Sequence, residues 1–325
     1  MVIFDSFAPL PKIKISEDYP VLVEESIKNS DNMDDCFSIP VTRYIRRDNR
    51  QTDEIRPINI RTNVIKAADG SAYVSMGKTK VLCGVYGPNI SKQNISDGGL
   101  SISVEFVTGS FCREKDSFVS KTKYSRYQND QQNDIKSNDR LNSILIEKII
   151  HSVVCQNKYR RNKIDCYFYL IEDDGSSFSA TIIASCLALC NAQIELIGLY
   201  SSIKIIATPL KNIFKKGDCI NERTNNKDSN THSKDKYIML IDPTSFELNK
   251  LNNNYSSLEI GICTVRNQIV YMSAVGSFFS DQSRIEEAFA LAEASCSALV
   301  NEIKDHMIAE IKNNDNNKIC NNVPT

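Results

Sequence analysis

The chain has 325 residues, of which 41% are hydrophobic and 24% are charged, a composition typical of folded globular proteins. Its formal net charge of −1 excludes a uniformly basic surface, so any contact with a nucleic acid has to come from local basic segments. No apolar run approaches the roughly 18 residues of a membrane span, and residues 1–20 lack the basic start of a signal peptide. We therefore expect no contact with a membrane and a cytosolic or nuclear location.

The sequence contains 11 cysteines but no CxxC pair, and only three histidines. This pattern argues against a zinc site or a disulfide framework, and we expect no metal and no cofactor. Thiols in apolar stretches instead pack as small hydrophobic side chains. Six cysteines lie in such stretches: Cys83, Cys166, Cys186, Cys190, Cys263 and Cys296.

Shifts in composition predict how the chain is organised. Residues 1–40 are polar and weakly periodic, which predicts an N-terminal arm, and residues 41–312 are predicted to form a single domain. Within this domain, residues 114–140 predict a mobile loop, and the Asn- and Lys-rich residues 215–236 predict a low-complexity insertion. Residues 313–325 predict a disordered tail.

The first half of the domain predicts mainly β-strands. Residues 71–76 and 79–87 alternate on either side of a glycine turn, a pattern typical of a hairpin, and another strand is expected near 61–67. Residues 100–106 also alternate, which predicts a half-buried strand. Its buried face would hold Leu100, Ile102, Val104 and Phe106.

The hydrophobic period then changes to that of helices. A helix is predicted near 141–153 with its apolar face at Leu141, Ile144, Leu145, Ile149 and Val153. A strand near 164–170 precedes a nearly all-apolar helix at 179–193, which should be buried on most sides. Four further strands are expected near 203–208, 237–241, 258–265 and 268–275.

A long amphipathic helix should follow, capped by Ser280 or Asp281. Its predicted apolar face holds Ile285, Ala288, Phe289, Ala292, Cys296, Leu299 and Ile303. The order of strands and helices predicts an α+β fold with antiparallel or mixed β-sheets and helices packed on them.

Residues 56–88 combine Arg56 and Arg61 with Gly70-Ser71-Ala72, Gly77-Lys78-Thr79 and Gly87-Pro88. With these features at this spacing, the segment resembles the opening of the RNase PH family. The resemblance continues at 170–189, 240–248 and 261–276, and spans roughly residues 40–210 and 237–311. Within the family, the segments 70–88 and 240–244 look most like a ring subunit of the RNA exosome.

This resemblance implies an RNase PH-like fold and a set of partners. The partners would be other RNase PH-like subunits in a hetero-hexameric ring, cap subunits and RNA. The implied locations are the nucleus, the nucleolus and the cytoplasm.

Active members of this family are phosphorolytic, and a Gly-Gly-Thr-Arg-Thr turn at a helix N-terminus holds their phosphate. The matching positions here are Gly175, Ser176, Ser177, Phe178 and Ser179. Phe178 stands where the arginine would be, and an aromatic ring offers no charged, two-pronged donor. The sequence therefore predicts a degenerate phosphate site with no catalytic residue.

Active members also carry two acidic residues, six apart, after the strand that here ends at Asp242. The aligned positions fall near Leu248 and near Ser257-Leu258. Glu247 and Glu259 lie next to them, so substitution by either glutamate stays open.

Basic residues interleaved with aromatic residues are suited to single-stranded RNA, although a solvated loop with local packing is the alternative. The candidate RNA-binding residues are Arg56, Arg61, Arg113, Lys121, Lys123 and Arg126. The favoured interpretation is a non-catalytic structural and RNA-guiding exosome subunit, which supports 3′-to-5′ RNA processing and degradation. Two alternatives are an active phosphorolytic 3′-to-5′ exoribonuclease and a small-molecule-binding module.

Overall fold

The structure is a computed structural model, and its described part comprises most of the predicted domain. The described residues are Arg46, 48–90, 99–110, Cys112, 127–209, 237–251, 254–265, 267–277 and 282–321. Within these, the side chains of 127–136 and 313–321 are not described. The predicted arm, the insertion at 215–236 and the two candidate caps Ser280 and Asp281 lie outside the described residues.

The first sheet has five strands in the order β1-β2-β3-β5-β4. Their bounds are β1 Ile58–Thr62, β2 Gly70–Met76, β3 Thr79–Ile90, β4 Ser101–Thr108 and β5 Asn162–Glu172. The predicted hairpin is confirmed as β2 and β3, whose turn uses Gly77 at a φ of +58°. β4 is parallel to β5, whereas the other pairs are antiparallel, so the sheet is mixed.

The second sheet has four antiparallel strands in the order β7-β6-β8-β9. They are β6 Tyr200–Pro209, β7 Tyr237–Ile241, β8 Ser256–Cys263 and β9 Gln268–Val275. Pro209, the last residue of β6, pairs with Tyr237, the first residue of β7. The two strands therefore pair without any residue of the segment 210–236.

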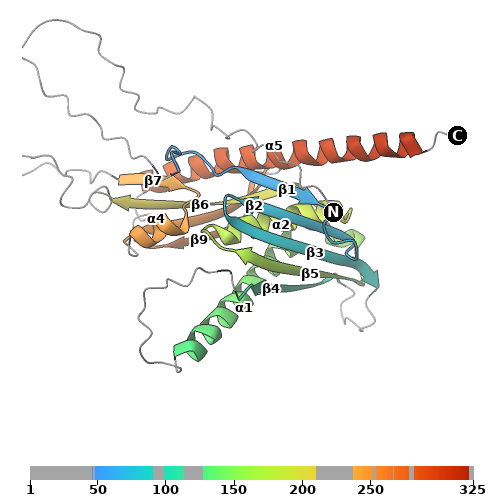
Figure 1. Cartoon of the computed structure of the whole chain (residues 1–325), viewed down its shortest axis with the longest axis horizontal. Helices are drawn as coiled ribbons and strands as arrows, with labels where there is room; N and C mark the ends of the chain where they lie inside the picture. The colour runs from blue at the N-terminus through green and yellow to red at the C-terminus, as the bar shows by residue number, and fades with distance from the viewer. Residues whose placement is uncertain are drawn as a thin grey trace, which may run out of the picture.

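The helices are α1 Tyr127–Val153, α2 Ser177–Asn191, α4 Ser245–Lys250 and α5 Gln282–Asn321, with a short 3₁₀ turn at Gln156–Lys158. α2 packs on β2 and β3 of the first sheet and on β6 of the second, so it lies between them (Figure 1). The hydroxyls of Ser185 in α2 and Tyr200 in β6 lie 2.7 Å apart. The neighbouring Ser201 donates instead to the carbonyl of Cys296 in α5, at 3.0 Å. Because adjacent strand residues point to opposite faces, α2 and α5 lie on opposite sides of the second sheet.

Burial confirms most of the predicted faces. Ala288, Ala292, Cys296, Leu299 and Ile303 of α5 are buried, as are Leu100, Ile102 and Phe106 beside β4. Five of the six predicted packing cysteines are buried, and Cys190 is partly buried. The α+β architecture is therefore confirmed.

Two helices extend into segments that the sequence predicts to be a loop and a disordered tail. The loop predicted at 114–140 is helical from Tyr127, and α5 continues past residue 313 to Asn321. Residues 127–140 and 313–321 contain no proline or glycine, so nothing in their backbone stops a helix. The apolar face of α1 is also rotated, because Ile146 and Ile150 are buried whereas Leu141 is 58% exposed.

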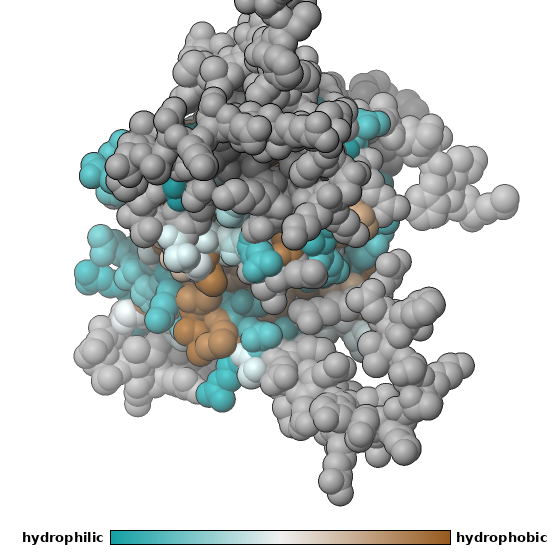
Figure 2. Space-filling model, turned by 90° about the vertical axis from the view of Figure 1, so that its left-hand side faces the viewer, coloured by the Kyte–Doolittle hydropathy of each residue, from teal (hydrophilic) through white to brown (hydrophobic). Residues whose placement is uncertain are grey.

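Exposed apolar side chains remain on several elements. Viewed from the side that carries β7 and α4, the surface shows a small group of hydrophobic atoms among hydrophilic ones (Figure 2). The exposed large hydrophobic residues include Phe246 of α4, Ile269, Met272 and Val275 of the edge strand β9, and Val265 just before it. Within the described residues, no helix combines the length and the apolar character needed to cross a membrane.

Candidate functional site

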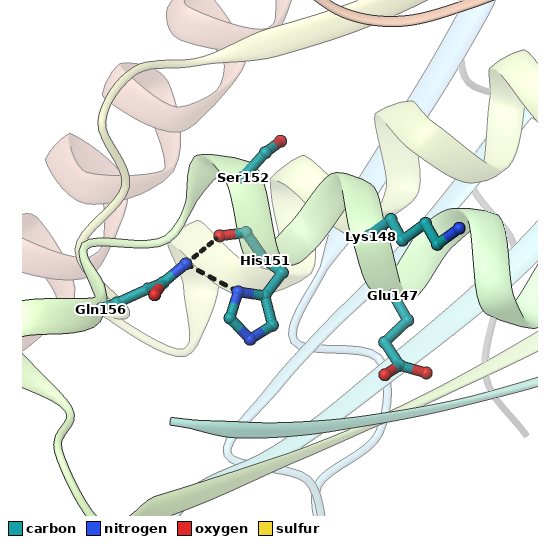
Figure 3. A pocket seen from close by; sticks show the side chains of 5 residues that line it. All are labelled: Glu147, Lys148, His151, Ser152 and Gln156. Carbon is teal, nitrogen blue, oxygen red and sulfur yellow. Dashed lines mark hydrogen bonds between the residues drawn. The ribbon is translucent and has the colours of Figure 1, made fainter. Parts of the chain in front are cut away.

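A surface hollow beside the C-terminal part of α1 has little chemical content. It encloses about 360 Å³ and is lined by Glu147, Lys148, His151, Ser152 and Gln156. The amide nitrogen of Gln156 lies 2.6 Å from Nδ1 of His151 and donates to the His151 carbonyl (Figure 3). The imidazole is thus engaged by its own helix end, and we assign it no role.

The loop that precedes α2 is the candidate site, because it holds the positions that match the phosphate turn of the family. Gly175 has a φ of +86°, and Ser176 follows in the left-handed region at +54° as the N-cap of α2. A side chain at Gly175 would collide with the carbonyl of Pro243, so only glycine fits. The backbone amides of the first turn of α2 start from this loop, where the helix dipole favours negative charge.

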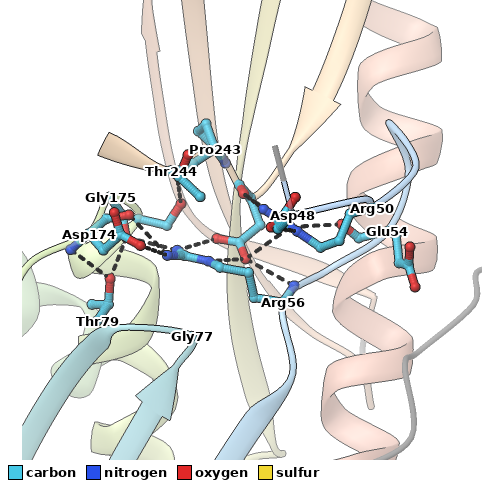
Figure 4. A network of polar contacts seen from close by, with 12 residues as sticks. Asp48, Arg50, Glu54, Arg56, Gly77, Thr79, Asp174, Gly175, Pro243 and Thr244 are labelled. Atoms are coloured by element: carbon cyan, nitrogen blue, oxygen red, sulfur yellow. Dashed lines mark hydrogen bonds and ion pairs between the residues drawn. The ribbon is translucent and has the colours of Figure 1, made fainter. Parts of the chain in front are cut away.

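Arg56 holds this loop in place from the side of the first sheet (Figure 4). Its guanidinium donates to the carbonyls of Asp174 and Gly175, both at 2.9 Å. It also forms a two-pronged ion pair with Asp242, with Nε–Oδ2 and Nη2–Oδ1 distances of 2.7 Å. The Thr79 hydroxyl donates to the Gly175 carbonyl at 2.9 Å. The loop is therefore fastened to residues from both sheets.

Asp242 is the acidic centre of this network. Burial by itself would raise the pKa of Asp242, but the guanidinium of Arg56, the charge of Arg50 and the hydroxyl of Ser176 outweigh it and bring the pKa to about 2. The carbonyl of Asp242 also accepts from Arg46 at 3.2 Å. Asp242 is therefore a fixed anion that holds arginines, and it has no free face for substrate.

Arg56 consequently does not fit the role in RNA binding that the sequence predicted for it. Its side chain is 3% exposed and its donors are used inside the protein. Arg61 is exposed on β1. The other four candidate RNA-binding residues, Arg113, Lys121, Lys123 and Arg126, lie outside the described residues.

A carboxylate lies at the first turn of α2. The hydroxyl of Ser179, which is fully buried, donates to Oε1 of Glu259 on β8 at 2.7 Å. Burial raises the pKa of Glu259, while Lys204 on the adjacent strand and the hydroxyl and backbone amide of Ser179 act in the opposite direction. The anion-favouring end of α2 is thus already facing an acidic side chain of the same chain.

Phe178 points to the same region as Glu259. Its ring lies 5.0 Å from that of Tyr271 on β9, with an interplanar angle of 49°. The ring packs against the core rather than standing free in solvent. The position that matches the family's arginine therefore contributes an apolar wall.

Glu247, the other glutamate that the sequence left open, has a structural role. It closes a capping box with Thr244 at the start of α4. Its carboxylate also accepts from Arg46 at 2.7 and 3.1 Å. Glu247 is 4% exposed and does not face Ser179, so of the two glutamates Glu259 is the one at the candidate site.

Sequence reasoning missed three polar residues that build the site. Arg46 binds Glu247, Arg50 binds the carbonyl of Asp242, and Thr79, which the sequence places only in a turn, binds the carbonyl of Gly175. The segment around Arg46 carries no hydrophobic periodicity that could have located it. The Thr244–Glu247 spacing is a local signal that could have located α4. Among the described residues, no group of three or more potential metal ligands occurs.

Comparison with known proteins agrees with this geometry. Residues 54–195 match the model of the 3′ exoribonuclease family, domain 1. The putative exosome complex component RRP41 of Caenorhabditis elegans is 35% identical over 159 residues, which are 48% of this chain and 60% of that protein. The exosome complex component Rrp41 of Archaeoglobus fulgidus is 26% identical over 166 residues, 50% of this chain and 58% of that protein. The chain thus spans about 60% of the length of these relatives.

Two solved structures share the fold. Rice Rrp46 superposes with a TM-score of 0.56 at 17% identity, over 82% of this chain and 100% of that one. A chain of the Archaeoglobus fulgidus exosome, solved with RNA bound to the active site, superposes with a TM-score of 0.54 at 19% identity, over 79% of this chain and 92% of that one. The chain therefore has an RNase PH-like α+β fold, and it is similar in sequence to proteins named as exosome components.

Proposed function

We propose that the chain is a non-catalytic ring subunit of the RNA exosome that supports 3′-to-5′ RNA processing and degradation. The relatives named as exosome components support membership in that complex. The proposed partners are other RNase PH-like subunits in a hetero-hexameric ring, cap subunits and RNA. The proposed locations are the nucleus, the nucleolus and the cytoplasm.

The observation that supports a non-catalytic role is that the N-terminal turn of α2 already contacts side chains of the same chain. A phosphorolytic site needs cationic and amide donors aimed at an attacking phosphate. Here Phe178 packs on Tyr271, and Ser179 donates to Glu259. A phosphate at this turn would meet a carboxylate without an arginine at position 178 to offset the repulsion.

The test is an assay of the pure chain with single-stranded RNA, inorganic phosphate and Mg²⁺. The proposal expects no nucleoside diphosphate above a sample without the chain. Release of nucleoside diphosphates that depends on phosphate would overturn it.

One observation favours the alternative, an active phosphorolytic exoribonuclease. Glu259 is a carboxyl with a raised pKa beside the phosphate turn, which suits a general acid for the departing 3′ oxygen. If the chain is active, Glu259→Gln should abolish that activity and Glu247→Gln at the capping box should not. If neither the chain nor the variants release product, the non-catalytic proposal stands.

The position in the ring is proposed from two motifs. Residues 70–88 and 240–244 look most like the exosome subunit called mRNA transport regulator three, whereas the compared sequence relatives are named Rrp41. Mass spectrometry of cross-linked complexes purified from the native cell through a tag on this chain would identify its ring neighbours. A tagged chain that brings down no RNase PH-like subunit would contradict ring membership.

A further inference from the structure

The face of the first sheet that points away from α2 carries an aromatic hollow. In Figure 1 the strands of this sheet lie in front of α2, and no described helix covers their near face. The hollow encloses about 760 Å³. Its lining includes Ile65, Leu82, Tyr86, Val107, Tyr167 and Tyr169. We call this surface the tyrosine hollow.

The floor of the hollow exists because one position lacks a side chain. Gly84 of β3 is the ladder partner of Tyr167 on β5, and a side chain at Gly84 would lie 3.2 Å from Cδ1 of Ile65. Next to it, the rings of Tyr86 and Tyr167 pack edge to face at 5.7 Å. A sheet face in water normally carries polar residues, so this aromatic lining indicates an occupant.

The two tyrosines of β5 are available to such an occupant. Tyr167 is 48% exposed and Tyr169 is 37% exposed. Tyrosine offers a large contact area at a small cost in side-chain entropy, which is why it is enriched among the residues that dominate binding energy.

The charges around the hollow select against nucleic acid. Glu105 is exposed on β4, and Asp165 on β5 lies 2.8 Å from its own partner, Lys163. Both carboxylates line the hollow. Lys163 offsets the charge of Asp165, so the negative charge of Glu105 is the one that repels a phosphate backbone and attracts a cationic chain, and the hollow fits a segment that is apolar and basic.

The sequence of this chain contains such a segment at residues 7–15, Phe-Ala-Pro-Leu-Pro-Lys-Ile-Lys-Ile. Pro9 and Pro11 favour the extended polyproline II conformation, which aromatic-lined grooves bind in other proteins. Lys12 and Lys14 supply positive charge that complements Glu105. We infer that residues 7–15 dock in the tyrosine hollow of their own chain.

The length of the intervening chain permits this contact. About 30 residues separate Ile15 from Arg46, and when extended they reach up to roughly 100 Å. The longest strand of the sheet has 12 residues and spans only about 40 Å. The arm can therefore reach the hollow from Arg46 without strain.

Limited trypsin digestion of the full chain tests the contact. Docking shields Lys12 and Lys14, whereas Lys28 in the same arm lies outside the docked segment and acts as an internal reference. In the double variant that carries both Tyr167→Ser and Tyr169→Ser, the arm should be released. We expect the ratio of cleavage at Lys12 and Lys14 to cleavage at Lys28 to rise about tenfold in this variant. The matched control is Phe246→Ser, since Phe246 is an aromatic residue on α4 with a similar exposure of 49%. This control should leave the ratio unchanged.

A photo-reactive amino acid at position 107 on β4 identifies the occupant directly. The inference expects a cross-link to residues 7–15 within one chain, at a yield that does not change on dilution. A cross-link to added single-stranded RNA or to a second copy would overturn it. An unchanged cleavage ratio in the tyrosine variant, or an equal rise in the Phe246→Ser control, would overturn it as well.

Discussion

The guanidinium of Arg56 and the carboxylate of Asp242 form a buried ion pair in which both prongs measure 2.7 Å. The two residues lie 186 positions apart, and their side chains are 3% and 0% exposed. Because both charges are buried, each is stabilised by the other, and the α2 loop is held by Arg56.

Removal of one partner should be strongly destabilising. Arg56→Met leaves Asp242 in the core with a poorer set of donors, and we expect the free energy of unfolding to fall by about 3–5 kcal/mol. Urea unfolding followed by circular dichroism measures it. The control is Lys80→Met, which removes an exposed ion pair with Glu172 and should cost less than about 1 kcal/mol. Equal losses in both variants would contradict the structural role of Arg56.

Asp242 should make stability depend on acid pH. Its pKa is lowered from 3.8 to about 2 in the folded chain, so its contribution is present above 3.8 and is lost as the pH falls toward 2. That contribution is about 2 kcal/mol. Asp242→Asn lacks this titration, so its stability should decline less than that of the unaltered chain between pH 5 and 2. Parallel declines in urea unfolding across this range would count against the assignment.

Glu259 should keep phosphate away from α2. Glu259→Gln removes the charge but keeps an oxygen that can accept from Ser179, so the amide end of α2 becomes open to an anion. We expect phosphate at high millimolar concentration to stabilise this variant by about 1 kcal/mol more than the unaltered chain. Thermal unfolding in phosphate and in chloride of equal ionic strength measures the difference. Glu172→Gln, at the exposed end of β5, is the control, and a phosphate effect shared by all three proteins would refute the idea.

The insertion at 215–236 should be dispensable for folding. Pro209 and Tyr237 are ladder partners, so a turn of a few residues can connect β6 to β7. Replacement of the insertion by a short Gly/Ser linker should change stability by only about 1 kcal/mol, toward greater stability, because a shorter loop loses less entropy. A fall in the melting temperature of more than a few degrees would show that the insertion packs on the fold.

The isolated chain should self-associate through its apolar edges. The exposed positions on β9 include Ile269, Met272 and Val275, and β9 is an edge strand. Met272→Asp should abolish pairing with an RNase PH-like partner and leave the monomer folded, as judged by sedimentation and circular dichroism. Leu141→Asp, at an exposed apolar position of α1, should still pair. A soluble monomer that ignores every RNase PH-like chain of the same cell would contradict a ring subunit.

Local signals account for what the sequence could predict. The β2–β3 hairpin followed from the turn at Gly77, and the buried face of α5 followed from its helical period. The RNase PH resemblance located the α2 loop. What could not be predicted depends on contacts between distant residues. Arg56 looks like an RNA contact until Asp242 is placed beside it, and Glu259 is one of two equivalent glutamates until β8 brings it to Ser179.

The position of α2 between the two sheets has a consequence for how the chain folds during synthesis. The match to the family model ends at residue 195, but β6, which packs on α2, starts at Tyr200, and the carboxylate that pairs with Arg56 comes later still, at Asp242. A nascent chain that has emerged only to residue 195 would expose one side of its most apolar helix and hold an unpaired arginine. The first sheet therefore cannot complete its packing until the second sheet has been synthesised. The end of the family match thus does not mark the end of an independent folding unit.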